Sequence, residues 1–305
     1  MQAMILAAGL GTRLRPLTFH IPKPLFPVLN QPLVERLGTS LAAQGFSRIF
    51  INTYHLAESM ESWHAGFRSG SATITLVREP ELLGTGGGIR NVFSRCARRD
   101  MPLLVINGDV VTDIDLKRVW DLHCSKRDTP LASMVLHSRS PWNKVRVQDG
   151  SVLSFEYHGG DALAFTGISV LSPGLMANIP EGPGSIITAI ETAMVSGGEV
   201  RAIMAGDVSV QAGRWIWEDV GTPAGYLMAH ERLIDRDLAQ SRCVVADDAV
   251  LPQSFRVGEW VCIGNRAVVE EDVRLDRCVV WANSVVPAGT RAQSCVFTPY
   301  GVLRV

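Results

Sequence analysis

The chain has 305 residues, of which 47% are hydrophobic and 19% charged, which excludes a disordered chain and allows one large domain or two smaller ones. Its formal net charge of −1 provides no overall basic field for nucleic acid or an anionic membrane surface. No window has the roughly 18 apolar residues of a membrane span, and the N-terminus lacks the basic region of a secretory signal, so we expect a cytoplasmic protein.

The first 238 residues alternate short apolar runs with amphipathic segments. Strands are predicted at residues 3–8, 48–52, 74–78 and 102–107, and helices at residues 32–44, 56–67, 86–95, 115–125 and 222–236. This alternation predicts an α/β fold with a Rossmann-like, doubly wound, mainly parallel sheet. Residues 144–155 differ, because period-two runs on both sides of Asp149-Gly150 predict an antiparallel hairpin.

After residue 238, apolar residues recur every six positions in two ladders. The first ladder is Val257, Ile263, Val269 and Leu275, and the second is Val261, Ala267, Val273, Val279 and Val285. A six-residue repeat predicts a short parallel β-helix at residues 239–305, after an α/β domain at residues 1–238. A β-sandwich with coincidental spacing is the alternative. With few coils, the β-helix is expected to pack on the first domain or on another subunit.

The stretch MILAAGLGTRLRPLT, Met4–Thr18, begins as a buried strand and breaks into glycine and arginine. It has the first two glycines of a dinucleotide fingerprint, but Leu14 replaces the third and the acidic ribose contact is missing. A glycine loop with Arg13 and Arg15 at its tip suits a polyphosphate. The alternative is a tight turn with two solvated arginines.

Prolines flank Lys23 in PKPLFPV, residues 22–28. They predict an extended backbone that presents the lysine as a fixed point charge for a phosphate. The alternative is a solvated lysine in a rigid loop.

Glycine is concentrated in ELLGTGGGI, residues 81–89, with four glycines in five positions. Such a backbone could approach a flat ligand such as a nucleobase, and no Walker lysine follows it. The alternative is a glycine-rich start of a helix.

Two aspartates follow predicted strands at distant points of the chain. Asp109 lies in INGDVV, just past a buried strand, where open α/β sheets bind ligands, and Asp219 lies in WIWEDVGTP before a turn. Two carboxylates together with substrate phosphates form a typical Mg²⁺ site. For either aspartate alone, a helix cap or turn residue is the simpler interpretation.

The motifs GLGTRLRPLT, PKPLFPV, LGTGGGI, NGDV, FTGISVL and WEDVGTP occur in this order between residues 9 and 223. Together they closely resemble the sugar-1-phosphate nucleotidyltransferases, also called nucleotide-sugar pyrophosphorylases. The six-residue repeat resembles the left-handed β-helix tail of many members. The resemblance implies a nucleoside triphosphate and a sugar 1-phosphate as substrates, a nucleotide sugar and pyrophosphate as products, and Mg²⁺ as cofactor.

The resemblance also implies roles for individual residues. Arg13 would stabilise charge on the transferring phosphate and the leaving pyrophosphate, Lys23 would contact the phosphates, and Asp109 and Asp219 would hold the metal. The implied nucleotide-binding residues are Ala7, Ala8, Gly9, Gly11, Thr12, Arg13, Gly84, Thr85, Gly86 and Asn107. The implied sugar-binding residues are Glu156, Thr166 and Gly167.

The sugar side departs from the family pattern. In SFEYHGG, Tyr157 stands where many members have a lysine that approaches the sugar phosphate. Lys144 and Arg146 are the nearest replacement cations, and we treat them as a hypothesis for the sugar-phosphate contact. The segment GSIITAIE also has no charge before Glu191, whereas many members carry a charged cluster there.

Three other functions were weighed. A hexapeptide-repeat acyltransferase needs a histidine base on its β-helix, but all seven histidines lie at or before His230. An oxidoreductase lacks the complete fingerprint. A catalytically silent, nucleotide-sugar-binding subunit remains the alternative, although the presence of Arg13, Lys23, Asp109 and Asp219 favours an active enzyme. The tail is therefore expected to be structural or to mediate a homo-oligomer.

The substrate stays open on the sequence. MILAAG, LGTGGGI and FTGISV resemble enzymes that uridylylate N-acetylmuramate 1-phosphate, whereas LGTGGGI with a β-helix tail resembles guanylyltransferases of mannose or heptose 1-phosphate. The six cysteines form no CxxC pair, so we expect reduced and mostly buried thiols.

Overall fold

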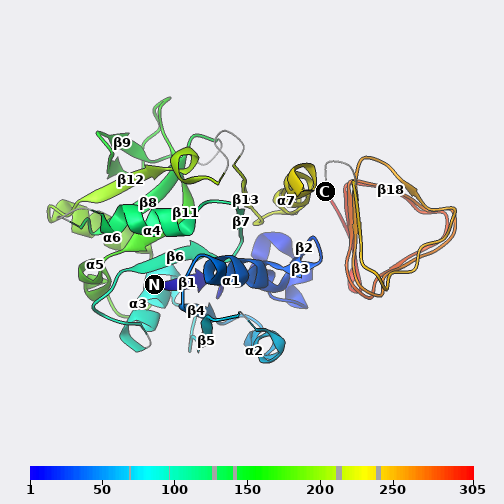
Figure 1. Cartoon of the computed structure of the whole chain (residues 1–305), viewed down its shortest axis with the longest axis horizontal. Helices are drawn as coiled ribbons and strands as arrows, with labels where there is room; N and C mark the ends of the chain where they lie inside the picture. The colour runs from blue at the N-terminus through cyan, green and yellow to red at the C-terminus, as the bar shows by residue number, and fades with distance from the viewer. Residues whose placement is uncertain (69, 96, 126–128, 140–142, 211–214, 238–241) are drawn as a thin grey trace. The chain divides into compact units, whose positions relative to one another are not determined.

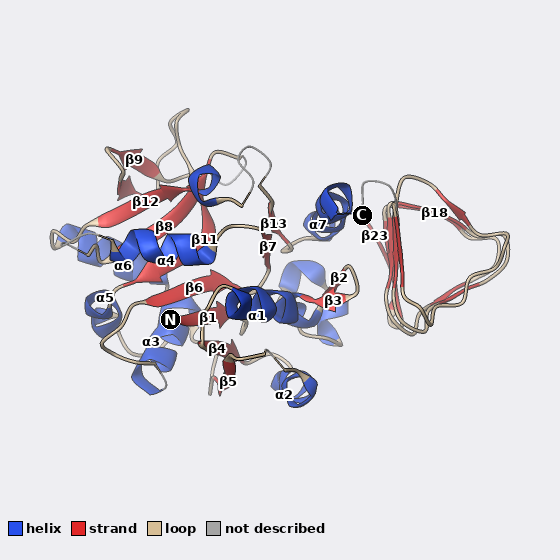
Figure 2. Ribbon diagram, in the orientation of Figure 1, coloured by secondary structure: helices blue, strands red, loops and turns tan. Residues whose placement is uncertain are grey.

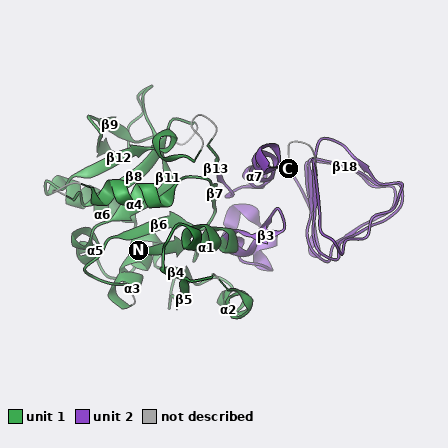
Figure 3. Cartoon of the chain, viewed as in Figure 1, with its two compact units in different colours: residues 1–10, 34–217 green, residues 11–33, 218–305 purple. Residues whose placement is uncertain are grey.

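The computed structural model describes residues 1–68, 70–95, 97–125, 129–139, 143–210, 215–237 and 242–305. They form two compact units (Figure 3). Unit 1 contains residues 1–10 and 34–217, and unit 2 contains residues 11–33 and 218–305. The loop after the first strand therefore groups with the C-terminal tail. The expected domain boundary at residue 238 falls where residues 238–241 lie outside the described ranges.

Unit 1 is built on a nine-stranded sheet of order β5-β4-β1-β6-β11-β8-β12-β10-β9. Its strands are β1 (Gln2–Leu6), β4 (Arg48–Thr53), β5 (Thr73–Arg78), β6 (Leu103–Asn107), β8 (Ala132–His137), β9 (Arg146–Gln148), β10 (Ser151–Ser154), β11 (Ala164–Leu171) and β12 (Val200–Met204). Strands β1, β4, β5 and β6 are parallel, whereas β11 runs antiparallel to both β6 and β8. Figure 2 shows this sheet with helices packed around it.

Within the described part of unit 1, six α-helices accompany the sheet. They are α1 (Leu33–Ala43), α2 (Ala57–Gly66), α3 (Gly84–Arg95), α4 (Leu116–Cys124), α5 (Pro173–Asn178) and α6 (Ile186–Val195). Apolar side chains of α3, α5 and α6 share a core cluster with one set of alternating strand residues, such as Met4 and Met134. Helix α4 contacts β8 on the opposite face, because its His123 bonds to Ser133, the neighbour of Met134 in the strand.

The expected elements are confirmed, with ends within two residues of the predicted ones. The hairpin β9–β10 is antiparallel, and its turn residues Asp149 and Gly150 have φ of 51° and 78°. Positive φ at both turn residues is typical of a type I′ hairpin turn. The elements from β11 to β12 were not predicted, because their apolar runs show neither period clearly.

His123 is completely buried and bridges two serines. Its Nδ1 lies 2.9 Å from Ser133 Oγ, and its Nε2 lies 3.1 Å from Ser172 Oγ. Burial, with the nearby charge of Arg201, lowers the pKa of His123 to about 4. The imidazole is therefore neutral in the folded protein at neutral pH.

We expect this histidine to make the fold sensitive to acid. Below its usual pKa of about 6.5, His123 takes up a proton in the unfolded chain but not in the folded one, so stability present above pH 6.5 is lost towards pH 4. The free energy of unfolding should fall by up to about 3 kcal/mol from this group. Urea unfolding at pH 7 and pH 4.5 measures the change. His123→Gln, which does not titrate, should show a flatter dependence, and an equal slope in both proteins would contradict the assignment.

Unit 2 contains the loop at residues 11–33, the helix α7 (Pro223–Asp237) and the tail. The loop holds the short strands β2 (Pro27–Val28) and β3 (Gln31–Pro32). The tail strands form three parallel sheets, which give the triangular coils seen in Figure 1. They are β14 (Cys243–Val245), β16 (Val261–Ile263), β19 (Cys278–Val280) and β22 (Cys295–Thr298) on one face; β15 (Arg256–Val257), β18 (Arg274–Asp276) and β21 (Arg291–Gln293) on the second; β17 (Val268–Val269) and β20 (Val285–Val286) on the third. The final strand β23 (Gly301–Arg304) pairs antiparallel with β22.

The tail is a parallel β-helix as predicted, but the prediction of its second apolar ladder is wrong beyond Val273. Val261 pairs with Cys278, seventeen positions later, so the six-residue phase slips by one. Val286 consequently points into the core with no exposure, while the predicted Val285 is 56% exposed. Val279 is buried but does not belong to the β-helix core cluster.

The five cysteines within the described ranges form no disulfide, and Cys96 lies outside those ranges. Among the helices that the structure describes, none combines the length and the apolar character needed to cross a lipid bilayer.

Candidate active site

The predicted site residues are divided between the two units. Gly11, Thr12, Arg13, Lys23 and Asp219 belong to unit 2, and the others belong to unit 1.

In unit 2, the loop turns sharply at Gly11. This residue has φ +60°, and a Cβ there would lie 2.8 Å from Thr18 Cγ2. Thr18 Oγ1 donates a hydrogen bond of 3.1 Å to Gly11 O, which closes the turn. The turn leads into a 3-10 helix at Thr12–Leu14, in which Leu14 is buried and Arg13 exposed. The second glycine of the motif is therefore required by packing and backbone conformation.

Arg13 and Asp219 are brought together by this turn. Arg13 Nη2 lies 3.8 Å from Asp219 Oδ2, with the side chains 53% and 30% exposed. A Cβ at Gly221 would lie 2.3 Å from the same Nη2, so Gly221 lies directly against the guanidinium. An exposed ion pair contributes at most about 1 kcal/mol to stability. The pair therefore adds little to stability, and a role of Arg13 and Asp219 in binding a charged ligand stays a prediction.

Lys23 is the first residue of a 3-10 helix, Lys23–Leu25, and the expected extended backbone is wrong. Pro22 is extended, but its carbonyl accepts from Leu25 N at 2.9 Å, and Lys23 O accepts from Phe26 N at 2.9 Å. These two bonds outweigh the preference of a residue before proline for extended backbone. A Cβ on Gly11 would lie 3.4 Å from Lys23 Cβ, so the two motifs meet within unit 2.

In unit 1, predicted residues gather at the carboxyl ends of β1 and β6. Asn107 ends β6, and Gly108 N donates to Leu6 O at 2.9 Å. Gly167, with φ +77°, lies against Asn107, because a Cβ on it would be 2.5 Å from Asn107 Nδ2. Asp109 lies just past this strand end, as predicted, and its side chain is half-buried.

A buried polar network supports this edge and was missed by the sequence reasoning. Ala7 N donates to Asn52 Oδ1 at 2.8 Å, Asn52 Nδ2 donates to Glu79 Oε1 at 2.7 Å, and Leu83 N donates to Glu79 Oε2 at 3.1 Å. Burial raises the pKa of the Glu79 carboxyl, although both accepted hydrogen bonds lower it. The network ties β1 and β4 to the loop before α3. In the sequence, this network is indicated by Asn52, a polar residue near the end of the apolar run RIFINT.

The glycines at the start of α3 are explained by packing within the protein. A Cβ on Gly87 would lie 2.2 Å from Gly182 O, and one on Gly84 would lie 2.7 Å from Gly184 O. Thr85 Oγ1 accepts from Ile186 N at 3.0 Å in the same contact. The glycine-rich start therefore has a structural reason, and contact with a nucleobase stays a prediction.

We expect Gly87→Ala to destabilise unit 1 by about 1–3 kcal/mol, because the added methyl group meets the Gly182 carbonyl at 2.2 Å. The shift in thermal unfolding measures the effect. Gly160→Ala is the matched control, since a Cβ there has no neighbour within 4 Å. Equal melting temperatures for the two variants would contradict this account.

On the predicted sugar side, Lys144 and Arg146 are exposed. Lys144 N donates to Leu163 O at 2.9 Å. Leu163 immediately precedes β11, the strand that contains Thr166 and Gly167, so Lys144 lies beside the start of that strand. Arg146 lies over the Tyr157 ring at 5.3 Å.

Two further predicted sugar-binding residues have contrasting environments. Glu156 is exposed, whereas the Thr166 hydroxyl is buried and donates to Val135 O at 2.8 Å.

An aromatic cluster beside Thr166 was also missed. Trp217 Nε1 donates to Thr166 O at 2.8 Å, and the ring centroids of Trp217 and His137 are 4.4 Å apart. His137 Nδ1 accepts from Arg139 N at 3.0 Å, and burial lowers the pKa of His137 to about 4. Arg139 stacks on Trp215 at 3.9 Å. Aromatic rings and a guanidinium next to the FTG motif suit a polar, ring-shaped ligand.

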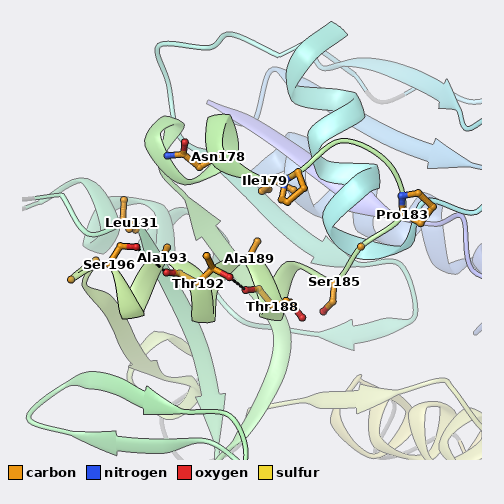
Figure 4. Close-up of a pocket in the computed structure, with 14 residues that line it drawn as sticks. Leu131, Asn178, Ile179, Pro183, Ser185, Thr188, Ala189, Thr192, Ala193 and Ser196 are labelled. Atoms are coloured by element: carbon orange, nitrogen blue, oxygen red, sulfur yellow. Dashed lines mark hydrogen bonds between the residues drawn. The ribbon is translucent and has the colours of Figure 1, made fainter.

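A pocket of about 860 Å³ lies along α6 (Figure 4). It is lined by the small side chains of that helix, such as Ala189 and Thr192, and by the segment before it. None of the predicted site residues lines it. We therefore do not place the reaction there.

Within the described ranges, no cluster of three or more histidine, cysteine, aspartate or glutamate side chains could hold a metal ion. The expected site uses only Asp109 and Asp219. Each is a carboxylate, the hard oxygen donor of which Mg²⁺ takes one or two before phosphates and water complete its coordination. Asp109 belongs to unit 1 and Asp219 to unit 2, and their shared site stays a prediction.

The chain has recognisable relatives among known proteins. A family model described as Nucleotidyl transferase matches residues 2–145. The chain is 35% identical over 230 residues to the N-acetylmuramate alpha-1-phosphate uridylyltransferase of Neisseria meningitidis, an alignment that covers 73% of this chain and 94% of that protein. The chain belongs to the sugar-1-phosphate nucleotidyltransferase family.

Other relatives of this nucleotidyltransferase use a different base. The chain is 32% identical over 160 residues to the D-glycero-alpha-D-manno-heptose 1-phosphate guanylyltransferase of Aneurinibacillus thermoaerophilus. This alignment covers 52% of this chain and 68% of that protein. The crystal structure of HddC from Yersinia pseudotuberculosis complexed with GMP-PN superposes with a TM-score of 0.61 and 24% identity, covering 76% of this chain and 99% of that one. That similarity shows the fold.

Proposed function

We propose that this nucleotidyltransferase is an active, Mg²⁺-dependent enzyme that transfers UMP or GMP to a sugar 1-phosphate. The observation that carries the proposal is the Arg13–Asp219 pair, a guanidinium 3.8 Å from a carboxylate. A catalytically silent relative would not need this arrangement of charged groups.

The reaction is an in-line displacement. An oxygen of the sugar phosphate forms a bond to the α-phosphorus, the bond from the α-phosphorus to the bridging oxygen breaks, and pyrophosphate leaves with that electron pair. Arg13 and Lys23 would neutralise charge on the transferring and leaving phosphates. Asp109 and Asp219 would hold Mg²⁺, which supplies positive charge to the triphosphate.

Two substrate pairs are proposed, each from a separate observation. Similarity to the Neisseria uridylyltransferase over 94% of that protein favours UTP with N-acetylmuramate 1-phosphate. Similarity to the heptose 1-phosphate guanylyltransferase, together with the β-helix tail, favours GTP with a heptose or mannose 1-phosphate.

The deciding experiment has two stages. A thermal-shift screen of UTP, GTP, dTTP, ATP and CTP with Mg²⁺ identifies the base, and pyrophosphate release is then measured with a panel of sugar 1-phosphates. Release with UTP or GTP supports the proposal. Binding of a nucleotide without release across the whole panel would instead support the silent, regulatory alternative.

A further inference from the structure

The β-helix has an apolar outer face that is covered within unit 2. Cys262, Val279 and Val296 are aligned in the middle of β16, β19 and β22. Their strand neighbours form the β-helix core, so these three side chains point outward. They are nevertheless 0–1% exposed. Another part of the unit must therefore cover this face.

Part of the cover is the loop at residues 11–33. Asn30 Nδ2 donates to Ile263 O at 2.9 Å, and Cys262 Sγ donates to Asn30 Oδ1 at 3.4 Å. Earlier in the loop, His20 stacks on Tyr300 with ring centroids 4.3 Å apart. The segment from His20 to Asn30, which includes Lys23, is therefore attached to the β-helix at both of its ends.

Between these ends, the Tyr226 hydroxyl of α7 connects the loop to the β-helix. It accepts from Trp281 Nε1 at 2.9 Å and donates to Pro27 O. The ring of Phe26 packs edge-on against Trp281, with centroids 4.9 Å apart. Phe26, Tyr226 and Trp281 are 0%, 1% and 4% exposed. The bond to Pro27 uses the single hydroxyl proton, and the bond from Trp281 uses a lone pair of the same oxygen.

We infer that the β-helix positions the phosphate-binding loop, and that Tyr226 and Trp281 are the positioning residues. The inference rests on the proposed function. Phe26 N closes the turn that begins at Lys23, so holding Phe26 and Pro27 also holds the Lys23 backbone. A loop held in place before the nucleotide binds loses less conformational entropy on binding. The tail of this enzyme thereby contributes to triphosphate affinity without touching the substrate.

Tyr226→Phe and Trp281→Phe test the inference, because both keep an aromatic ring and remove one partner of the connection. We expect the KM for the nucleoside triphosphate to rise roughly tenfold, as for the loss of one buried hydrogen bond. The KM for the sugar 1-phosphate should stay unchanged. Trp260→Phe is the matched control, because Trp260 also joins the β-helix to α7, by stacking on His230 rather than by a bond to Tyr226. It should leave both KM values unchanged.

A purely structural role gives a different result. In that case Tyr226→Phe and Trp281→Phe would lower the melting temperature and leave the KM for the triphosphate unchanged, which overturns the inference. A double-mutant cycle adds a second criterion: in a Lys23→Ala background, Tyr226→Phe should have little further effect on that KM, and full additivity would also overturn it. If Tyr226→Phe fails to fold, Trp281→Phe decides. Absence of activity in the wild-type protein would refute the proposed function instead.

Discussion

Replacing Arg13 by alanine is expected to lower kcat/KM for nucleotidyl transfer about a thousandfold while the protein stays folded. The guanidinium is 53% exposed and close to Asp219, so its removal costs little stability. It would be the principal cation on the transferring phosphate, and an arginine in that role is worth about 10³-fold or more in rate. Steady-state pyrophosphate release measures the loss, and thermal unfolding verifies the fold.

Two variants separate the role of Arg13 from a general effect of positive charge. Arg13→Lys keeps the charge but loses the planar fork of donors, so most of the loss should remain. Arg15→Ala removes a guanidinium that lies 5.0 Å from the Phe19 ring, and it should cost far less. Comparable losses at Arg13 and Arg15 would refute the specific assignment.

Asp109→Asn is expected to lower kcat at least a hundredfold, because a neutral amide holds Mg²⁺ poorly. Bound Mg²⁺ stabilises the charge of the transition state by several kcal/mol, and a loss of about 1.4 kcal/mol lowers the rate tenfold. The Mg²⁺ concentration for half-maximal rate should rise in parallel. The fold should persist, since Asp109 is half-buried just beyond the end of β6 and Asn differs little in size.

The control for this variant is Asp121→Asn. Asp121 is an exposed carboxylate on α4 that pairs with Lys117 one turn away. Its substitution should change neither kcat nor the Mg²⁺ dependence. Near-normal turnover of Asp109→Asn at low Mg²⁺ would remove Asp109 from the proposed metal site.

Much of the fold could be predicted from local pattern. The period-two and 3.6-residue runs from β1 to α4 and the Asp149-Gly150 hairpin were located within two residues of their observed ends. The order of the glycine, proline and aspartate motifs was sufficient to indicate the family. These features depend on residues close together in the chain, which is why a single sequence carries them.

Other features required knowledge of what each segment packs against. Lys23 forms a 3-10 turn rather than an extended strand, because two backbone hydrogen bonds outweigh the local preference imposed by proline. Val285 points outward because one coil of the β-helix has seventeen residues, a shift that a strict six-residue period does not anticipate. Gly87 is required by a carbonyl at Gly182, ninety-five positions away in the chain.

The sequence by itself determined the chemical character of this protein: a glycine loop with arginine and lysine, two aspartates at strand ends and a β-helical tail. Only the tertiary structure decided that Arg13 lies beside Asp219 and that the loop between Gly11 and Leu33 groups with the tail. The physical reason is the distance along the chain over which each kind of interaction acts. Glycine, proline and hydrophobic period act over a few residues, whereas the contact of Tyr226 with Pro27 and Trp281 joins segments roughly 200 and 55 positions apart, through bonds that form only when those segments pack.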